Sequence, residues 1–175
     1  MINSLPQFVP QKVCLSCDGC CRFKEEESRW RPKLAIEEKE LFKEQKIGLA
    51  QKIFSRDPVD SQGYLKTVSC SGGYHCTFFN LEKNTCRIYN HRPFECQLYP
   101  YILSRKEQKA AIFVHLNCPY VQEKIGSDEF KNYVLKLEQC LLDPEALAFL
   151  RGNPQLVGDY AEFQNELEFL FFLKI

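Results

Sequence analysis

Cys14-Leu-Ser-Cys17-Asp-Gly-Cys20-Cys21 is the stretch around which this chain is organised, because it places four thiols within eight residues. Cysteine side chains are short, so thiols this close in sequence either converge on one small object or are unusually reactive. C-x2-C is the spacing at which two sulfurs bind one ion from a tight turn, and C-x2-C-x2-C also binds iron–sulfur cubes. The stretch therefore predicts a metal or cluster site.

The rest of the composition is that of an ordinary globular protein. The chain has 175 residues, of which 45% are apolar and 26% charged, enough for one domain with a real hydrophobic core. Lys+Arg and Asp+Glu both number 23, and this balance argues against nucleic-acid binding by bulk electrostatics. No run of about 20 apolar residues exists, so we expect no membrane span.

The interpretation of the ten cysteines depends on whether the protein lies in a reducing or an oxidising cellular compartment. The N-terminus has no basic region, no continuous apolar stretch and no small-residue cleavage site, so we expect a cytoplasmic protein. Cysteines stay reduced there, and clustered ones indicate metal or redox sites. Cys20 and Cys21 are adjacent and poorly placed to bond each other. Metal binding is therefore preferred, with structural disulfides or free core thiols as the alternatives.

Strand and turn signals fill the middle of the chain. Residues 64–70 form a plausible strand, and residues 74–80 and 85–89 flank a turn that suits a hairpin with Asn84 in it. Cys76 and Cys86 would then lie on the two arms of this hairpin and could face each other. Two further elements are a short helix opened by Arg92-Pro93 and a strong strand over 110–116.

Helical signals lie on either side of these strands. Apolar residues at helical spacing predict a helix over 35–55, which Asp57-Pro58 ends. Ser127 caps a predicted helix to about 140, and a short helix follows over 143–152. A last helix is expected over about 158–174, apolar nearly all round at its end. It could pack into the core or form a contact with a protein partner or a second copy.

These elements predict an α+β fold, in which a small antiparallel sheet or hairpin carries the cysteines and packs with several helices. We expect a cysteine-cluster metal-binding domain over 1–125 and a helical C-terminal segment over 126–175, packed together as a single globular unit.

The cysteine pattern resembles a known family. Cys14-x2-Cys17-x2-Cys20-Cys21 is followed by Cys76, by Cys86-Arg-Ile-Tyr89-x-x-Arg92-Pro93-x-x-Cys96 with Tyr99-Pro100, and by Cys118. This combination resembles the CxxCxxCC cysteine-cluster family, the YkgJ-like proteins, described as zinc- or iron-chelating. The resemblance implies eight metal ligands: Cys14, Cys17, Cys20, Cys21, Cys76, Cys86, Cys96 and Cys118. Cys70 and Cys140 fall outside the pattern and are expected to be small buried hydrophobes.

Two kinds of site would use eight thiols. Zinc prefers four thiolates in a tetrahedron, so eight could close two structural sites. An iron–sulfur cube takes C-x2-C-x2-C plus a remote cysteine, often followed by proline, which Cys118-Pro119 satisfies. Cys21, Cys76, Cys86 and Cys96 would then form a second site or act as redox thiols. We narrowly prefer an iron–sulfur cluster to zinc.

Other polar residues have secondary roles in this hypothesis. Arg92 could donate hydrogen bonds to the sulfurs or could simply be a cap or surface ion pair. His75 or His91 could replace a thiol ligand, whereas His115 is expected to pack in the core. The paired acids of 25–27 and 37–38 are expected on solvated faces.

Three functions remain open. The first is an accessory or redox module that binds metal. The second is a cluster- or thiolate-dependent enzyme, since flagellin lysine-N-methylase looks similar over the same motif, although no glycine-rich turn for S-adenosylmethionine is evident. The third is a disulfide-stabilised structural protein. Eight cysteines that close two four-ligand sites leave no open ligand position, and this favours the binding module.

Overall fold

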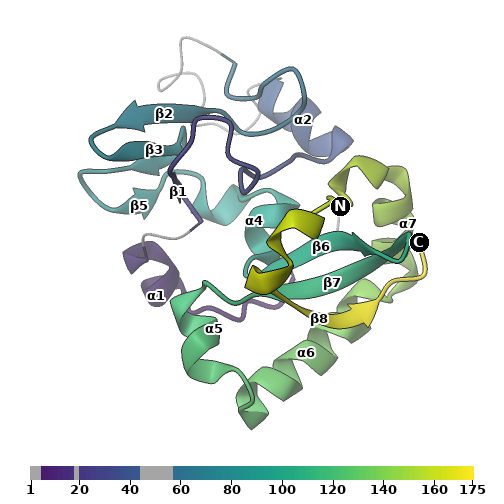
Figure 1. Cartoon of the computed structure of the whole chain (residues 1–175). Helices are drawn as coiled ribbons and strands as arrows, with labels where there is room; N and C mark the ends of the chain where they lie inside the picture. The colour runs from purple at the N-terminus through teal and green to yellow at the C-terminus, as the bar shows by residue number, and fades with distance from the viewer. Residues whose placement is uncertain (1–4, 18–19, 44–56) are drawn as a thin grey trace. The chain divides into compact units, whose positions relative to one another are not determined.

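Helices alternate with short antiparallel strands along the chain, which confirms the α+β class (Figure 1). The structure, a computed structural model, describes residues 5–17, 20–43 and 57–175. None of the helices among these residues is long and apolar enough to cross a bilayer.

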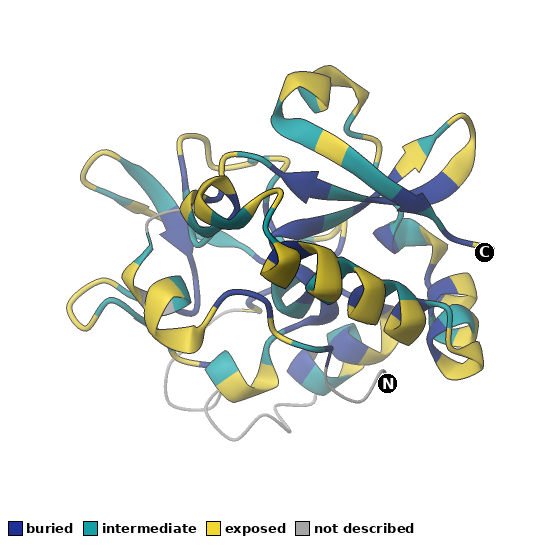
Figure 2. Cartoon of the chain, turned by 90° about the horizontal axis from the view of Figure 1, so that it is seen from below, coloured by how far each residue is buried: buried dark blue, intermediate teal, exposed yellow. Residues whose placement is uncertain are grey.

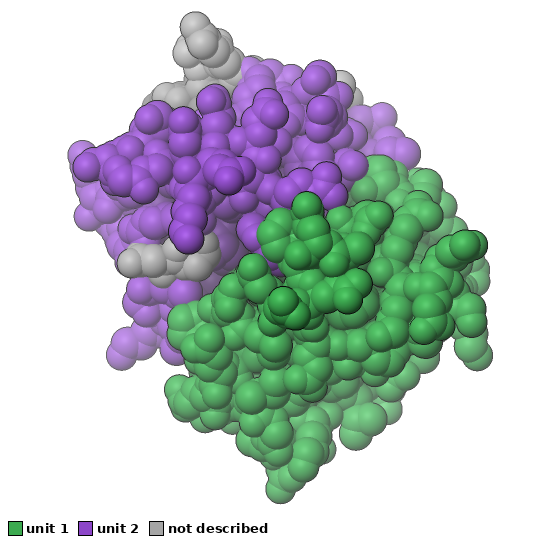
Figure 3. Space-filling model, viewed as in Figure 1, with its two compact units in different colours: residues 1–10, 97–175 green, residues 11–96 purple. Residues whose placement is uncertain are grey.

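Contacts within the chain define two units, which Figure 3 colours separately. Unit 1 contains Met1–Pro10 and Gln97–Ile175, and unit 2 contains Gln11–Cys96. Residues 97–125 and 126–175 therefore belong to the same unit.

Unit 2 combines short helices with two small antiparallel sheets. Three strands pair in the order β1-β3-β2, and β4 pairs with β5. Its described elements are α1 (Gln11–Ser16), β1 (Arg22–Phe23), α2 (Ile36–Lys43), β2 (Thr67–Cys70), β3 (Gly73–Cys76), β4 (Phe79–Asn80), β5 (Thr85–Cys86), η1 (Tyr89–His91) and α4 (Phe94–Leu98), which runs two residues into unit 1. The helix expected over 35–55 is present as α2, and residues 44–56 lie outside the described residues.

The predicted hairpin exists, but it is shorter than expected. Asn84 lies in its turn with φ of 49°, the left-handed conformation that asparagine tolerates. A turn at Thr77 and Phe78 divides the expected strand over 74–80 into β3 and β4, which belong to different sheets. Cys86 therefore pairs with Phe79, whereas Cys76 pairs with Thr67 of β2. The prediction that Cys76 and Cys86 face each other across one hairpin is wrong.

A buried apolar cluster supports these small sheets. Its buried members come from residues 23–88 of unit 2, and three cysteines pack within it or against it: Cys76, Cys21 and Cys86. The buried residues of the cluster are Phe23, Leu34, Phe42, Val59, Leu65, Cys76, Phe78, Phe79 and Ile88. These three thiols therefore lie in or against a packed hydrophobic core and not on unpacked loops.

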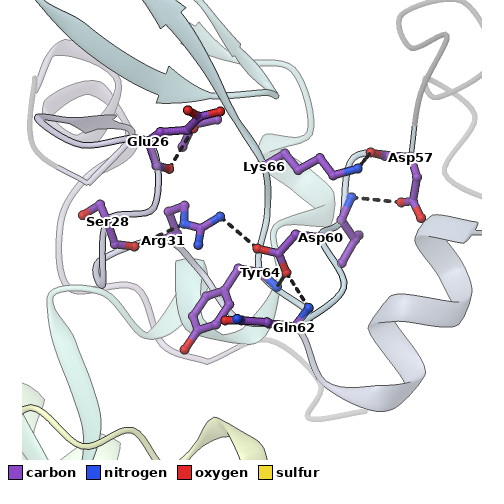
Figure 4. A network of polar contacts seen from close by, with 10 residues as sticks. Glu26, Ser28, Arg31, Asp57, Asp60, Gln62, Tyr64 and Lys66 are labelled. Carbon is purple, nitrogen blue, oxygen red and sulfur yellow. Dashed lines mark hydrogen bonds and ion pairs between the residues drawn. The ribbon is translucent and has the colours of Figure 1, made fainter.

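A polar network fastens two loops of unit 2 to each other (Figure 4). The Arg31 guanidinium donates to Asp60 Oδ2 at 2.9 Å and to the Ser28 carbonyl at 3.2 Å. The other oxygen of Asp60 accepts the N–H groups of Gln62 and Tyr64, both at 2.9 Å. The Arg31 charge also lies over the Tyr64 ring. Because both charged groups are hydrogen-bonded and partly buried, the network fixes the segment before α2.

Unit 1 is built on a three-stranded antiparallel sheet in the order β6-β7-β8. The strong strand expected over 110–116 is confirmed as its central strand. Buried residues concentrate on the first two of these strands, while turns and outer helix faces are exposed (Figure 2). The elements are β6 (Tyr101–Lys106), β7 (Lys109–His115), α5 (Pro119–Lys124), α6 (Asp128–Leu141), α7 (Pro144–Gly152), η2 (Pro154–Leu156), η3 (Ala161–Glu166) and β8 (Leu167–Phe172).

Two predicted helices of unit 1 are confirmed with their caps. Ser127 accepts the Phe130 N–H at the start of α6, and Asp143 accepts the Glu145 N–H at the start of α7. Tyr101 of β6 stacks on Tyr133 of α6 with ring centroids 5.1 Å apart. This aromatic contact packs α6 against the sheet.

The helix expected over 158–174 is wrong. Residues 161–166 form the 3-10 helix η3, and Leu167–Phe172 form the strand β8, which pairs with β7. A run that is apolar at nearly every position has no period to separate a buried helix from a strand. Its phenylalanines favour the strand, and β7 offers a ladder of free backbone groups on one side. A partner contact through a C-terminal helix therefore has no helix to use.

Candidate metal centre

Seven cysteines of unit 2 interact with one another, and we call them the thiol cluster: Cys14, Cys17, Cys20, Cys21, Cys76, Cys86 and Cys96. They lie within two short helices, at the ends of two short strands, or in the chain between such elements. Cys14 is on α1, Cys20 and Cys21 precede β1, and Cys96 is the third residue of α4. Cys76 and Cys86 end β3 and β5. The structure places none of the ten cysteines in a disulfide.

Adjacent cysteines at the centre of the cluster turn to different neighbours. The Cys20 thiol is hydrogen-bonded to the thiols of Cys14 and Cys21. Cys21 is electrostatically coupled to Cys76, Cys86 and Cys96. The two groups are not isolated, because Cys20 also acts on Cys76 and Cys96. Cys20 and Cys21 therefore connect the C-x2-C-x2-C run with the thiols of the small sheets.

Backbone groups already point at two of the sulfurs. The N–H groups of Phe78 and Ile88, each two residues beyond a cysteine, are hydrogen-bonded to Cys76 and Cys86 and lower the pKa of these thiols. The Cys76 N–H in turn donates to the Cys21 carbonyl at 2.9 Å. A donor aimed at a sulfur stabilises the thiolate form and fixes the direction of its lone pairs.

Burial and crowding oppose thiolate formation in the cluster. Burial, together with the neighbouring thiols of Cys86 and Cys20, raises the pKa of Cys76 to about 12. The pKa values of Cys86 and Cys96 are also raised, mainly by burial. The hydrogen bond with Cys20, followed by burial, raises the pKa of Cys14 well above its usual range. Thiols of this kind stay protonated at neutral pH until a cation replaces their protons.

Arg92 supplies a positive charge beside the cluster. It lowers the pKa of Cys14, Cys86 and Cys96, although burial or hydrogen bonding raises each of these values overall. Its guanidinium is held by the carbonyl of Tyr89 at 3.1 Å and lies 3.9 Å from the centroid of the Tyr89 ring. The residue can therefore offset part of the negative charge that several thiolates would bring.

The other cysteines lie in different surroundings. Cys118, the eighth expected ligand, is a buried residue of unit 1 that immediately precedes α5, and it raises the pKa of Tyr101. Its role as a ligand stays a prediction. The expectation that Cys70 and Cys140 are buried hydrophobes is wrong, because Cys70 is half-buried and Cys140 is exposed on α6.

The three histidines differ in environment. His75 is buried beside the cluster, with Nδ1 2.9 Å from the Cys76 carbonyl, so this nitrogen carries a proton. His91 is exposed at the end of η1. His115 is buried on β7 as expected, with Nδ1 3.2 Å from the Tyr99 hydroxyl and Nε2 3.4 Å from Glu166 Oε2. Of the two histidines proposed as substitute ligands, His75 lies next to a cluster cysteine.

Sequence reasoning missed two carboxylates near Cys96, the buried Glu38 and the half-buried Glu95. Glu38 was expected on a solvated face, and this is wrong because it is only 9% exposed. Glu95, next to Cys96, has its pKa raised to about 8 by burial, while the Lys33 N–H lowers it. No motif marks either residue, since the position that Glu38 caps is Ala35 and not serine or threonine.

The donor set fits zinc or iron, because both metals bind cysteine thiolates. Among the described side chains, however, no three His, Cys, Asp or Glu residues stand ready to hold one ion without rearrangement. The described side chains therefore do not assign particular thiols to one ion.

Comparison with known protein families gives a match over the cysteine pattern. The family model CxxCxxCC, described as a putative zinc- or iron-chelating domain, matches residues 13–119. This range contains the whole thiol cluster and Cys118, and it covers more than half of the 175 residues. No curated protein and no solved structure matches the chain.

Proposed function

This chain belongs to the CxxCxxCC family, and from that membership and the seven clustered thiols we propose that it holds zinc or iron through cysteine thiolates. The observation that carries the proposal is the thiol cluster itself. Seven sulfurs from four separate stretches of the chain are brought together, three of them in or against one apolar core, and a reduced protein gains nothing in stability from so many crowded thiols. A bound cation that replaces their protons would convert this crowding into ligation.

We propose two ligand groups. Cys21 is coupled to Cys76, Cys86 and Cys96, so these four thiols make one complete four-ligand set within unit 2. Cys14, Cys17 and Cys20 make the second group, and Cys118 is its proposed fourth ligand. The backbone donors on Cys76 and Cys86 support the first group, because such donors orient ligands before the metal arrives.

We propose an iron–sulfur cluster for the second group, because C-x2-C-x2-C with a remote Cys-Pro is the spacing that such clusters use. The first group favours zinc as a second candidate, since four thiolates from fixed backbone suit a closed tetrahedral site. Sites closed by four cysteines leave no position for a substrate. The proposed role is therefore an accessory or electron-carrying module that works with a partner.

The experiment is anaerobic purification followed by a visible spectrum and by assays of iron, zinc and acid-labile sulfide. A brown protein with matched iron and sulfide is the expected result for the iron–sulfur proposal. A colourless protein with two zinc ions would overturn that choice of metal and keep thiolate binding. A folded protein that holds neither metal and does not take up either when reconstituted would overturn the whole proposal.

A further inference from the structure

The buried carboxylate of Glu38 accepts hydrogen bonds from backbone N–H groups at the starts of two helices. Its Oε2 accepts the Ala35 N–H at 2.8 Å, one residue before α2 begins. Its Oε1 accepts the N–H of Phe94, the first residue of α4, at 2.6 Å. The first N–H groups of a helix have no partner within the helix, so Glu38 satisfies one such donor in each.

A second carboxylate, on α4, accepts a hydrogen bond from the segment before α2. Glu95 of α4 accepts the Lys33 N–H at 2.6 Å, three residues before α2. The segment 33–38 and the start of α4 are therefore bonded in both directions. Because α4 has only five residues, its own hydrogen bonds do little to hold it in one orientation.

The residue that depends on this orientation is Cys96. It follows Phe94 by two positions on α4 and is coupled to Cys20, Cys76 and Cys86 of the thiol cluster. Of the cluster cysteines, Cys96 is the one that lies beyond η1, and the N-terminal bond of its helix goes to Glu38.

We propose that Glu38 is the positioning residue that holds Cys96 toward the other thiols and so completes the metal site for a thiolate-binding ion, zinc or iron. This inference rests on the proposed function. Glu38 acts through the α4 backbone and does not touch the metal. A carboxylate is required because both oxygens accept, whereas a glutamine has one acceptor and would turn an N–H group toward a backbone N–H.

The test uses the full chain after chelator treatment and titration with Co²⁺, whose thiolate charge-transfer band grows with the number of bound sulfurs. The variants are Glu38→Gln, Cys96→Ser and the double variant. Glu40→Gln is the matched control, because Glu40 is exposed on the same helix. We expect Glu38→Gln to weaken Co²⁺ binding about 10- to 100-fold, the range for residues that orient metal ligands. Its band should shrink to that of Cys96→Ser.

The double variant separates positioning from general destabilisation. If Glu38 acts through Cys96, adding Glu38→Gln to Cys96→Ser weakens binding no further. An unchanged affinity in Glu38→Gln, or an equal loss in both backgrounds, would overturn the inference. Should Glu38→Gln fail to fold, as judged by circular dichroism, Glu38→Asp replaces it, since aspartate keeps both oxygens at a shorter reach and should give a smaller loss of the same kind.

A metal-free measurement keeps this inference distinct from the proposed function. In apoprotein, alkylation mapped by mass spectrometry should modify Cys96 about tenfold faster in Glu38→Gln than in the wild type and leave Cys86 unchanged. Equal rates at Cys96 would overturn the inference. If wild-type protein binds no Co²⁺, the proposed function fails, and the alkylation rates still decide whether Glu38 holds Cys96.

Discussion

At the scale of single residues, the cysteines divide into proposed ligands and cysteines outside the cluster. Cys20 and Cys21 connect the two groups of the thiol cluster, whereas Cys140 is exposed on α6. We expect Cys20→Ser or Cys17→Ser to remove at least one metal equivalent, because a site that loses one thiolate loses most of its affinity. Cys140→Ser should retain the full content. Metal analysis of each purified variant checks this, and equal losses in all three would refute the assignment.

Arg92 makes a second prediction at this scale, because its charge lies near three thiols that share no other cation in the described contacts. We expect Arg92→Gln to weaken metal binding about tenfold, or about 1.4 kcal/mol. Arg92→Lys should recover part of this loss, since it restores the charge without the planar stacking on Tyr89. A competition titration with a chelator measures the affinities.

The control for Arg92 is Arg87→Gln, because Arg87 is next to a cluster cysteine in sequence but is exposed. Its affinity should stay within about twofold of the wild type, since exposed charges are screened by water and salt. Equal effects at the two arginines would mean that the charge acts by proximity in sequence and not by its fixed position.

His115 makes a prediction about pH. Burial lowers its pKa below the usual 6.5, and Glu166 opposes part of this shift. Below pH 6.5 the unfolded chain therefore binds a proton that the folded chain does not, so stability falls as the pH falls through this window. We expect His115→Gln to flatten the dependence as the pH falls below 6.5, where the slope from one group is at most about 1.4 kcal/mol per pH unit.

Urea unfolding at several pH values measures this slope. His91→Gln is the matched control, since His91 is exposed, and its curve should parallel that of the wild type. A wild-type stability that rises on acidification, with the rise absent in His115→Gln, would show that the charged imidazole is favoured in the folded state.

At the scale of elements, the strand β8 predicts unequal stability losses for substitutions at two neighbouring residues. Neighbouring residues of a strand face opposite sides, and Phe171 is buried against the core while Phe172 is half-buried on the other face beside Lys109. We expect Phe171→Ala to lower the free energy of unfolding by about 3–4 kcal/mol and Phe172→Ala by about 1 kcal/mol. Chemical denaturation of both variants tests this, and equal losses would contradict the strand.

Elements with a clear period or a clear cap could be predicted from the sequence. The Ser127 and Asp143 caps and the apolar strand β7 were located within a few residues because local chemistry decides them. β8 could not be, since its apolar run suits a helix or a strand and its partner β7 lies about 50 residues earlier. The two strands on either side of Thr77 and Phe78 were merged because no glycine or proline marks that turn.

At the scale of the whole molecule, the candidate ligands could be named from spacing, but their arrangement could not. The sequence pattern contains eight cysteines, while the described couplings join seven of them, all in unit 2. Side-chain direction decides these couplings, and sequence spacing does not fix direction in turns. Glu38 was missed for a similar reason, because its second acceptor bond goes to a residue 56 positions away.

The two units should respond differently to loss of metal. Unit 2 has small sheets whose core contains Cys76 and packs against Cys21 and Cys86, whereas unit 1 has a longer sheet with an apolar and aromatic core of its own. A ligand that binds the folded state at 100 times its Kd stabilises it by about 2.7 kcal/mol. Chelation should therefore speed amide exchange about 100-fold in the β2–β3 ladder and leave β6–β7 unchanged. Hydrogen exchange by mass spectrometry, with and without chelator, resolves the two ladders. Cys21→Ser is the control, because it removes the proposed site shared with Cys76, Cys86 and Cys96, so chelation should accelerate the β2–β3 ladder less in this variant than in the wild type. Equal acceleration in both ladders of the wild type would mean that the metal supports the two units alike, and it would refute the prediction that the β6–β7 ladder is stable without metal.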